Sequence, residues 1–236
     1  KRHLHVLSDN QEQNAINKLA GARILLVEDN LINQELAMEL LSDAGIVVRV
    51  AGDGKQALEQ LEVELFDGVL MDLQMPVMDG ITATRNIRAQ RKHKNLPIIA
   101  MTANVMSGDR EKVLEVGMDD LIGKPINVVN MYTTMAKWIV PSKPASPPPD
   151  PLSTAPEGEG KAAQDGEALP ELEGIDVKRG LSNSHEKIKI WHKLLRLFHD
   201  DQREFVERFR EQQLREAITD MTRLAHTLKG VAGTIG

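Results

Sequence analysis

The chain has 236 residues, contains no Cys and carries a formal net charge of −6 at pH 7. This length favours two small domains, and the charge gives no general attraction to nucleic acid or to an anionic membrane. The missing Cys excludes disulfides and thiolate metal sites. Aromatic residues make up only 3% of the sequence, which leaves no platform for stacking bases, and no apolar run approaches the roughly 20 residues of a membrane-spanning helix.

The N-terminal stretch, residues 1–21, is polar with a mild helical pattern, and Gly21 is placed to end a helix. The chain begins with Lys1 rather than Met, which indicates a piece of a longer protein. We therefore interpret residues 1–21 as a linker from an upstream region, without chemistry of its own.

Residues 22–140 alternate short apolar segments with helical patterns. The apolar segments, which we predict to be strands, are 23–29, 47–50, 67–72, 97–102 and 119–123. Between them apolar residues recur at helical spacing, as at Leu36, Leu40 and Leu41. This alternation predicts an α/β domain in which a doubly wound, five-stranded parallel sheet has helices on both faces.

Eight of the eleven prolines fall between Pro141 and Pro170, mixed with Ser, Ala, Gly and Glu. Such a composition buries too little apolar surface to offset the entropy of ordering, so we predict a flexible linker over 141–170. After it, residues 171–236 have no strand pattern. Apolar residues at helical spacing predict an antiparallel pair of helices over 186–212 and 215–229, part of an all-α bundle.

Acidic side chains stand where the first and third predicted strands end. Glu28 and Asp29 close the first strand and Asp72 closes the third, while Thr102 and Lys124 stand at the ends of the fourth and fifth. The carboxyl ends of parallel strands share one edge of a sheet, where ligands bind. Three carboxylates there would repel one another unless a cation lies among them, and hard oxygen ligands suit Mg²⁺.

This residue set suits phosphoryl transfer to a carboxylate. A metal and Lys124 would neutralise charge on the transferred group, Thr102 would bind one of its oxygens, and Asp72 would attack to give an acyl phosphate. Lys124-Pro125 is a candidate cis peptide. One Asp or Thr at a strand end is more often a turn former or a helix cap, but joint placement at four strand ends favours a function.

The stretch "RLAHTLKGVAGTIG", 223 to 236, holds a candidate histidine. On the predicted helix the apolar residues face the core and leave His226 on the exposed side, with Gly230 and Gly233 on its face. Bare backbone beside an imidazole lets another active site approach it. Lys229 is placed to balance the charge of a phosphoryl group, and a neutral imidazole can act as a nucleophile.

Several motifs carry a family resemblance: "ILLVEDNLINQELAMELL", "VLMDLQMPVMDGITATRNIR", "LPIIAMTANVM" and "GMDDLIGKPI". With them, residues 22–140 resemble the flavodoxin-like receiver domain of bacterial two-component response regulators. The resemblance implies that Asp72 is the phosphoacceptor, with Thr102 as the switch hydroxyl and Lys124 as the conserved-type lysine. It implies a Mg²⁺ site made by Glu28, Asp29, Asp72 and the backbone carbonyl of Gln74.

Two positions depart from the family pattern. Glu28 replaces the commoner Asp, which lengthens the reach to the metal. Leu121 stands where many receivers have a Tyr or Phe that turns inward on activation, so switching here is expected to rest on loop movement.

The C-terminal stretch resembles the histidine phosphotransfer domain, a four-helix bundle in which His226 would be the phosphoacceptor. Receiver, linker and phosphotransfer part together resemble the C-terminal portion of a hybrid sensor histidine kinase. The implied partners are an upstream kinase domain of the same parent chain and a separate downstream response regulator. The implied location is the cytoplasm, with a parent anchored in the inner membrane. Since the chain stops at Gly236, we expect the core of residues 171–236 to be incomplete.

Other functions would leave other marks. A Mg²⁺-dependent phosphohydrolase with an aspartyl phosphate would need a second acid after Asp72, where "DLQMP" offers Leu and Gln. A DNA-binding regulator would need a basic recognition helix. A docking module that is never phosphorylated would not need the acids, Thr and Lys. "DGKQ" at 53 to 56 lacks the glycine spacing of a phosphate-binding loop, so the chain itself has no ATP site.

Overall fold

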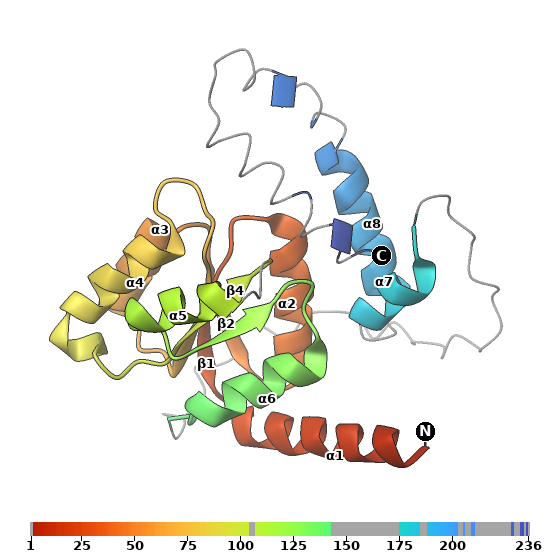
Figure 1. Ribbon diagram of the computed structural model, residues 1–236, viewed down its shortest axis with the longest axis horizontal. Helices are drawn as coiled ribbons and strands as arrows, with labels where there is room; N and C mark the ends of the chain where they lie inside the picture. The colour runs from red at the N-terminus through yellow and green to blue at the C-terminus, as the bar shows by residue number, and fades with distance from the viewer. Residues whose placement is uncertain are drawn as a thin grey trace, which may run out of the picture.

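The computed structural model describes residues 2–103, 107–142, 175–184 and 188–202, and the single residues 205, 209, 210, 228, 232, 233 and 235. Five parallel strands form one sheet in the order β2-β1-β3-β4-β5 (Figure 1). The strands are β1 (Arg23–Val27), β2 (Val47–Ala51), β3 (Gly68–Asp72), β4 (Ile98–Thr102) and β5 (Asp120–Gly123). The predicted α/β class with a parallel five-stranded sheet is confirmed. Because β1 pairs with both β2 and β3, the strand order reverses between them, where ligands of such sheets bind.

Helices cover both faces of the sheet. The helices of residues 22–140 are α2 (Leu31–Asp43), α3 (Gly54–Val63), α4 (Gly80–Ala89), the 3-10 helix η1 (Arg91–His93), α5 (Ser107–Glu115) and α6 (Val128–Trp138). Along β1 the side chains alternate: Ile24 and Leu26 pack with α2 and α6, and Leu25 and Val27 with α3, α4 and α5. The result is two apolar cores, one on each side of a sheet with buried strands.

Four of these helices begin at an Asn or Asp that accepts backbone N–H bonds. Asn30 caps α2, Asp53 caps α3, Asp79 caps α4 and Asn127 caps α6. Such caps satisfy N–H groups that have no partner within the helix, each worth about 1 kcal/mol. Three of the capped helices (α2, α3 and α4) follow the strand ends of β1, β2 and β3, so the caps also set the loops that hold the acidic residues.

Helix α1 (Arg2–Leu19) lies along α6 at the bottom of Figure 1. Ala15 and Leu19 are buried in the same core as Met131 and Met135 of α6. The predicted end of this helix near Gly21 is confirmed by its positive φ of 80°. Residues 2–19 therefore pack on the receiver sheet's helical layer through their last two turns.

Two helices follow the predicted linker: α7 (Val177–Asn183) and α8 (Ile188–Gln202). Sequence patterns did not predict α7, a short helix held by its Asp176 cap. Helix α8 lies within the predicted span 186–212 and packs against α2 (Figure 1). Residues 211–227 lie outside the described residues, so the second predicted helix and His226 stay predictions.

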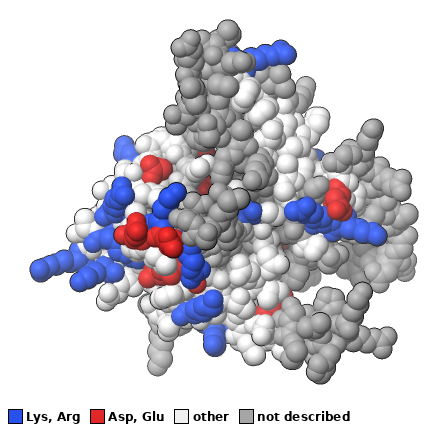
Figure 2. Space-filling model, in the orientation of Figure 1, with Lys and Arg blue, Asp and Glu red and all other residues white. Residues whose placement is uncertain are grey.

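Basic side chains gather over α4 and η1, on the left of Figure 2. Those of this stretch with exposed or half-buried side chains are Arg85, Arg88, Arg91, Lys92 and Lys94. Two of them are in ion pairs, Arg88 with Asp119 and Lys92 with Glu62, which reduces the charge of this surface. None of the described helices is long and apolar enough to span a membrane.

Gly80 should be irreplaceable at the start of α4. A Cβ added there would lie 2.1 Å from the backbone oxygen of Asp72, so Gly80→Ala must displace the loop and is expected to lower the free energy of unfolding by roughly 3 kcal/mol. Gly52→Ala is the matched control, because its Cβ would meet only the Gln56 side chain, at 3.5 Å, and should cost less than about 0.5 kcal/mol. Urea denaturation of both variants measures the difference; equal stabilities would contradict the close approach.

Candidate functional site

Four predicted site residues meet at the carboxyl edge of the sheet. Glu28 and Asp29 follow β1, Asp72 ends β3, and Lys124 follows β5. One oxygen from each of the three acids lies within 4.8 Å of the others. The strand order accounts for this meeting, because β1 and β3 are neighbours in the sheet. The sequence placed these acids on separate strands, and the sheet brings them to one point.

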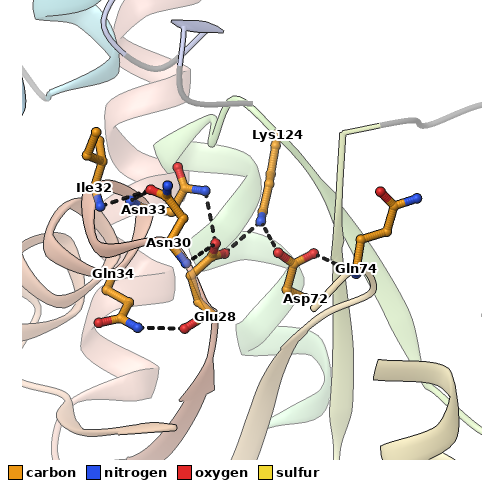
Figure 3. Close-up of polar contacts among 8 residues, drawn as sticks. All are labelled: Glu28, Asn30, Ile32, Asn33, Gln34, Asp72, Gln74 and Lys124. Atoms are coloured by element: carbon orange, nitrogen blue, oxygen red, sulfur yellow. Dashed lines mark hydrogen bonds and ion pairs between the residues drawn. The ribbon is translucent and has the colours of Figure 1, made fainter. Parts of the chain in front are cut away.

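Lys124 joins two of the acids. Its Nζ donates to Glu28 Oε2 at 2.6 Å and to Asp72 Oδ2 at 2.7 Å (Figure 3). The side chains are almost inaccessible, with 6% of Lys124, 1% of Glu28 and 5% of Asp72 exposed. A buried ion pair keeps its charges only when the geometry is good and further hydrogen bonds complete it. The Lys124–Pro125 peptide bond is cis.

Polar side chains at the start of α2 complete the surroundings of Glu28. Asn33 Nδ2 donates to Glu28 Oε1 at 3.0 Å, and Gln34 Nε2 donates to the Glu28 backbone oxygen at 2.6 Å (Figure 3). The Asn30 N–H also donates to Glu28 Oε1, at 3.4 Å. Sequence reasoning missed these three supports, although "EDNLINQ" signals a capped helix right after the acids.

Burial dominates the electrostatics of this cluster. Burial raises the pKa of Glu28 from 4.5 to about 7; Lys124 opposes the rise and Asp72 adds to it. Burial alone would lower the pKa of Lys124, but Glu28 and Asp72 together raise it above its ordinary value. Lys124 is therefore an ammonium at neutral pH. Three acids around one ammonium keep an excess of negative charge when ionised, which favours a cation among them.

The loop after Asp72 holds the carboxylate from the other side. The Gln74 N–H donates to Asp72 Oδ1 at 3.2 Å, so Lys124 and Gln74 occupy different oxygens of one carboxylate (Figure 3). Further along, the Met78 N–H donates to the Pro76 oxygen at 2.7 Å across Val77, which has a φ of 64°. This γ-turn is strained for a β-branched residue, at a cost of order 1–3 kcal/mol, and its strain lies next to the predicted phosphoacceptor.

Thr102 and Leu121 stand on the strands beside Asp72. Thr102 ends β4 with 5% of its surface exposed, and its backbone oxygen accepts from the Lys124 N–H at 2.7 Å. Met101 is the register partner of Asp72, so Thr102 lies one residue beyond the level of the carboxylate. Leu121 is 8% exposed and packs in the core with Ala100 and Val113. The residue at the aromatic position is thus a core residue in this chain.

Comparison with known families agrees with this geometry. Residues 24–136 match the response regulator receiver domain. The chain belongs to the receiver domain family. Its residues 193–236 also match the Hpt domain, the histidine phosphotransfer family. The receiver domain is thus followed by an Hpt part, as in hybrid histidine kinases.

The receiver domain has relatives among sensor kinases. It is similar to hybrid signal transduction histidine kinase I of Dictyostelium discoideum, 37% identical over 159 residues that are 61% of this chain and 9% of the kinase. It is also similar to the sensor protein GacS of Pseudomonas syringae pv. syringae, 42% identical over 119 residues that are 49% of this chain and 13% of that protein. The chain thus spans a small part of these relatives. They include a bacterium and a eukaryote, so a bacterial origin stays a prediction.

Among solved structures, the receiver domain of a sensor histidine kinase from Pseudomonas aeruginosa PAO1 is 44% identical. The match covers 50% of this chain and 98% of that one, with a TM-score of 0.48. That structure has a magnesium ion coordinated in its active site cleft.

Lys124→Met should expose the dependence of the site on its cation. Two buried carboxylates would lose their shared partner, so the free energy of unfolding should fall by roughly 3 kcal/mol. Mg²⁺ should restore more stability to this variant than to the wild type, since it supplies the missing positive charge. Urea denaturation with and without Mg²⁺ measures both effects.

Lys92→Met provides the control for that substitution. It breaks an ion pair of similar length, 2.6 Å to Glu62, in which both side chains are about half exposed, so it should change stability by less than about 1 kcal/mol. A Lys124→Met variant as stable as Lys92→Met without Mg²⁺ would contradict the assigned role of Lys124.

Proposed function

We propose that this chain is the relay portion of a hybrid sensor histidine kinase. A phosphoryl group passes from a kinase histidine to Asp72, then to His226, and on to the Asp of a separate response regulator. The proposed parts are a linker from the kinase region (1–21), the receiver (22–140), a flexible linker (141–170) and part of a phosphotransfer domain (171–236). The observation that carries the proposal is the contact of Lys124 with both Glu28 and Asp72, beside a third acid.

The donor set fits a magnesium ion. Glu28, Asp29 and Asp72 offer hard carboxylate oxygens close enough to share one ion, and the proposed fourth ligand is the backbone carbonyl of Gln74. A bound Mg²⁺ would neutralise charge that develops on the transferred phosphoryl group. Lys124 and Thr102 would hold the remaining phosphoryl oxygens.

In the first step, a carboxylate oxygen of Asp72 attacks the phosphorus of a phosphohistidine. A P–O bond forms while the P–N bond breaks, and the released imidazole takes up a proton. The contacts from Lys124 and Gln74 hold the carboxylate in a fixed orientation, which lowers the entropy cost of attack. Loss of the Asp72 charge on acylation would free Lys124 to contact the phosphoryl group.

In the second step, a ring nitrogen of His226 attacks the phosphorus of the acyl phosphate. A P–N bond forms, the P–O bond breaks and Asp72 leaves as a carboxylate, while the imidazole gives up its N–H proton. The linker between the two parts raises the concentration of His226 around Asp72. The proposal includes an upstream kinase domain of the same parent chain, a location in the cytoplasm and no contact with nucleic acid.

Asp29→Asn should weaken magnesium binding. Removing one carboxylate from the three should lower the affinity for Mg²⁺ by at least about tenfold, as measured by isothermal titration calorimetry. Glu59→Gln, at an exposed position of α3, is the control and should bind as the wild type does. Equal affinities for the two variants would contradict a metal site at these acids.

Phosphoryl acceptance can be followed by intact mass in acetyl phosphate and Mg²⁺. The wild type should gain a phosphoryl group, Asp72→Asn should gain none, and His226→Gln should keep the label on Asp72. Chelation of Mg²⁺ should abolish labelling. If Asp72→Asn labels as well as the wild type, the proposed function is wrong; stoichiometric turnover of acetyl phosphate without label would instead favour a phosphohydrolase.

A further inference from the structure

Helix α2 is apolar on more sides than the sheet can cover. Its apolar residues are Leu31, Ile32, Leu36, Ala37, Met38, Leu40 and Leu41. Since each residue turns a helix by about 100°, Leu31 and Met38 lie nearly opposite Leu40. An ordinary surface helix has one apolar stripe. The pattern of α2 therefore calls for a second partner.

Residues of the C-terminal segment supply that partner. Leu194 of α8 is fully buried and Ile235 is 4% exposed, and both belong to the core that contains Leu36 and Leu40 of α2. Trp191, also fully buried, donates from Nε1 to the Ile235 oxygen at 3.0 Å. This bond ties α8 to the described end of the chain, so the two segments lie on α2 together.

Polar and close contacts fix the same arrangement. Lys193 of α8 forms an ion pair with Glu35 of α2, on the side of the helix where Leu31 and Met38 lie. A Cβ added at Gly233 would lie 3.6–3.8 Å from three carbons of Pro125. Pro125 directly follows Lys124, which bonds to Asp72. Residue 233 thus lies against the loop of the site.

We infer that α2 and the Lys124–Pro125 loop are the surface on which the chain's own C-terminal helices, 188–202 and 228–235, dock within one molecule. Leu194 and Ile235 provide the apolar contact, and the Glu35–Lys193 pair sets its register. The predicted helix face of His226 includes Gly233, two turns away. Docking therefore presents that face to the receiver site in cis. This consequence rests on the proposed phosphoryl transfer, but the docking itself does not.

Cross-linking tests the docking directly in the full chain, which has no native Cys. The variant Glu35→Cys with Lys193→Cys is treated with a short bismaleimide. Loss of this exposed ion pair costs less than about 1 kcal/mol, so the apolar contact should persist. The expected result is an intramolecular product that forms at least about tenfold faster than in the control and at a rate independent of protein concentration.

The control pair is Glu59→Cys with Lys193→Cys. Glu59 lies on α3, across the sheet from α2, so the linker alone must bring its thiol to residue 193. Equal rates for the two pairs would overturn the inference, as would cross-linking of the 35/193 pair only between two copies.

Substitutions at Gly233 test the functional consequence. Gly233→Ala adds a methyl group at an ordinary contact distance and should keep transfer from Asp72 to His226 within about threefold of the wild type. Gly233→Leu cannot fit against Pro125 and should slow that transfer by at least about tenfold, while Asp72 is still labelled by acetyl phosphate. Equal transfer in both variants would refute docking in cis as the route. Failure to label Asp72 in the wild type would refute the proposed function and leave the cross-linking result intact.

Discussion

One buried ammonium holds the site together. Lys124 lies between Glu28 and Asp72, and all three side chains are nearly inaccessible to water. Two carboxylates at this depth could not both keep a charge without it. The lysine comes from beyond β5, 96 residues along the chain from Glu28, so the site exists only when the sheet is complete. Folding and the chemistry of the site are therefore linked through one residue.

The loops around this lysine are shaped by local backbone constraints. Asn30 caps α2 and its N–H also contacts Glu28, so the helix start and the acid are held by the same turn. On the other side, the γ-turn at Val77 and the tight approach of Gly80 to Asp72 fix the loop after β3. Strain beside a reactive carboxylate is tolerated because surrounding contacts determine the loop.

The C-terminal helices extend this framework beyond the receiver. Their buried residues Trp191, Leu194 and Ile235 pack with each other and with the core under α2. An incomplete core was expected for residues 171–236. In the described residues, part of that core is supplied by the receiver, because α2 has an apolar side that the sheet does not cover. The wide apolar arc of α2 was visible in the sequence, but it does not by itself name the partner.

The sequence alone determined the parallel sheet and the acids, Thr102 and Lys124 at its strand ends, because strand periodicity and strand-end position are local properties. It also indicated the Gly that ends α1. Only the tertiary structure decided that Lys124 bonds to both Glu28 and Asp72, that Asn33 and Gln34 support Glu28, and that α8 lies on α2. The Lys193–Glu35 pair joins residues 158 positions apart. Such contacts depend on how finished elements pack, and no local pattern along the chain encodes them.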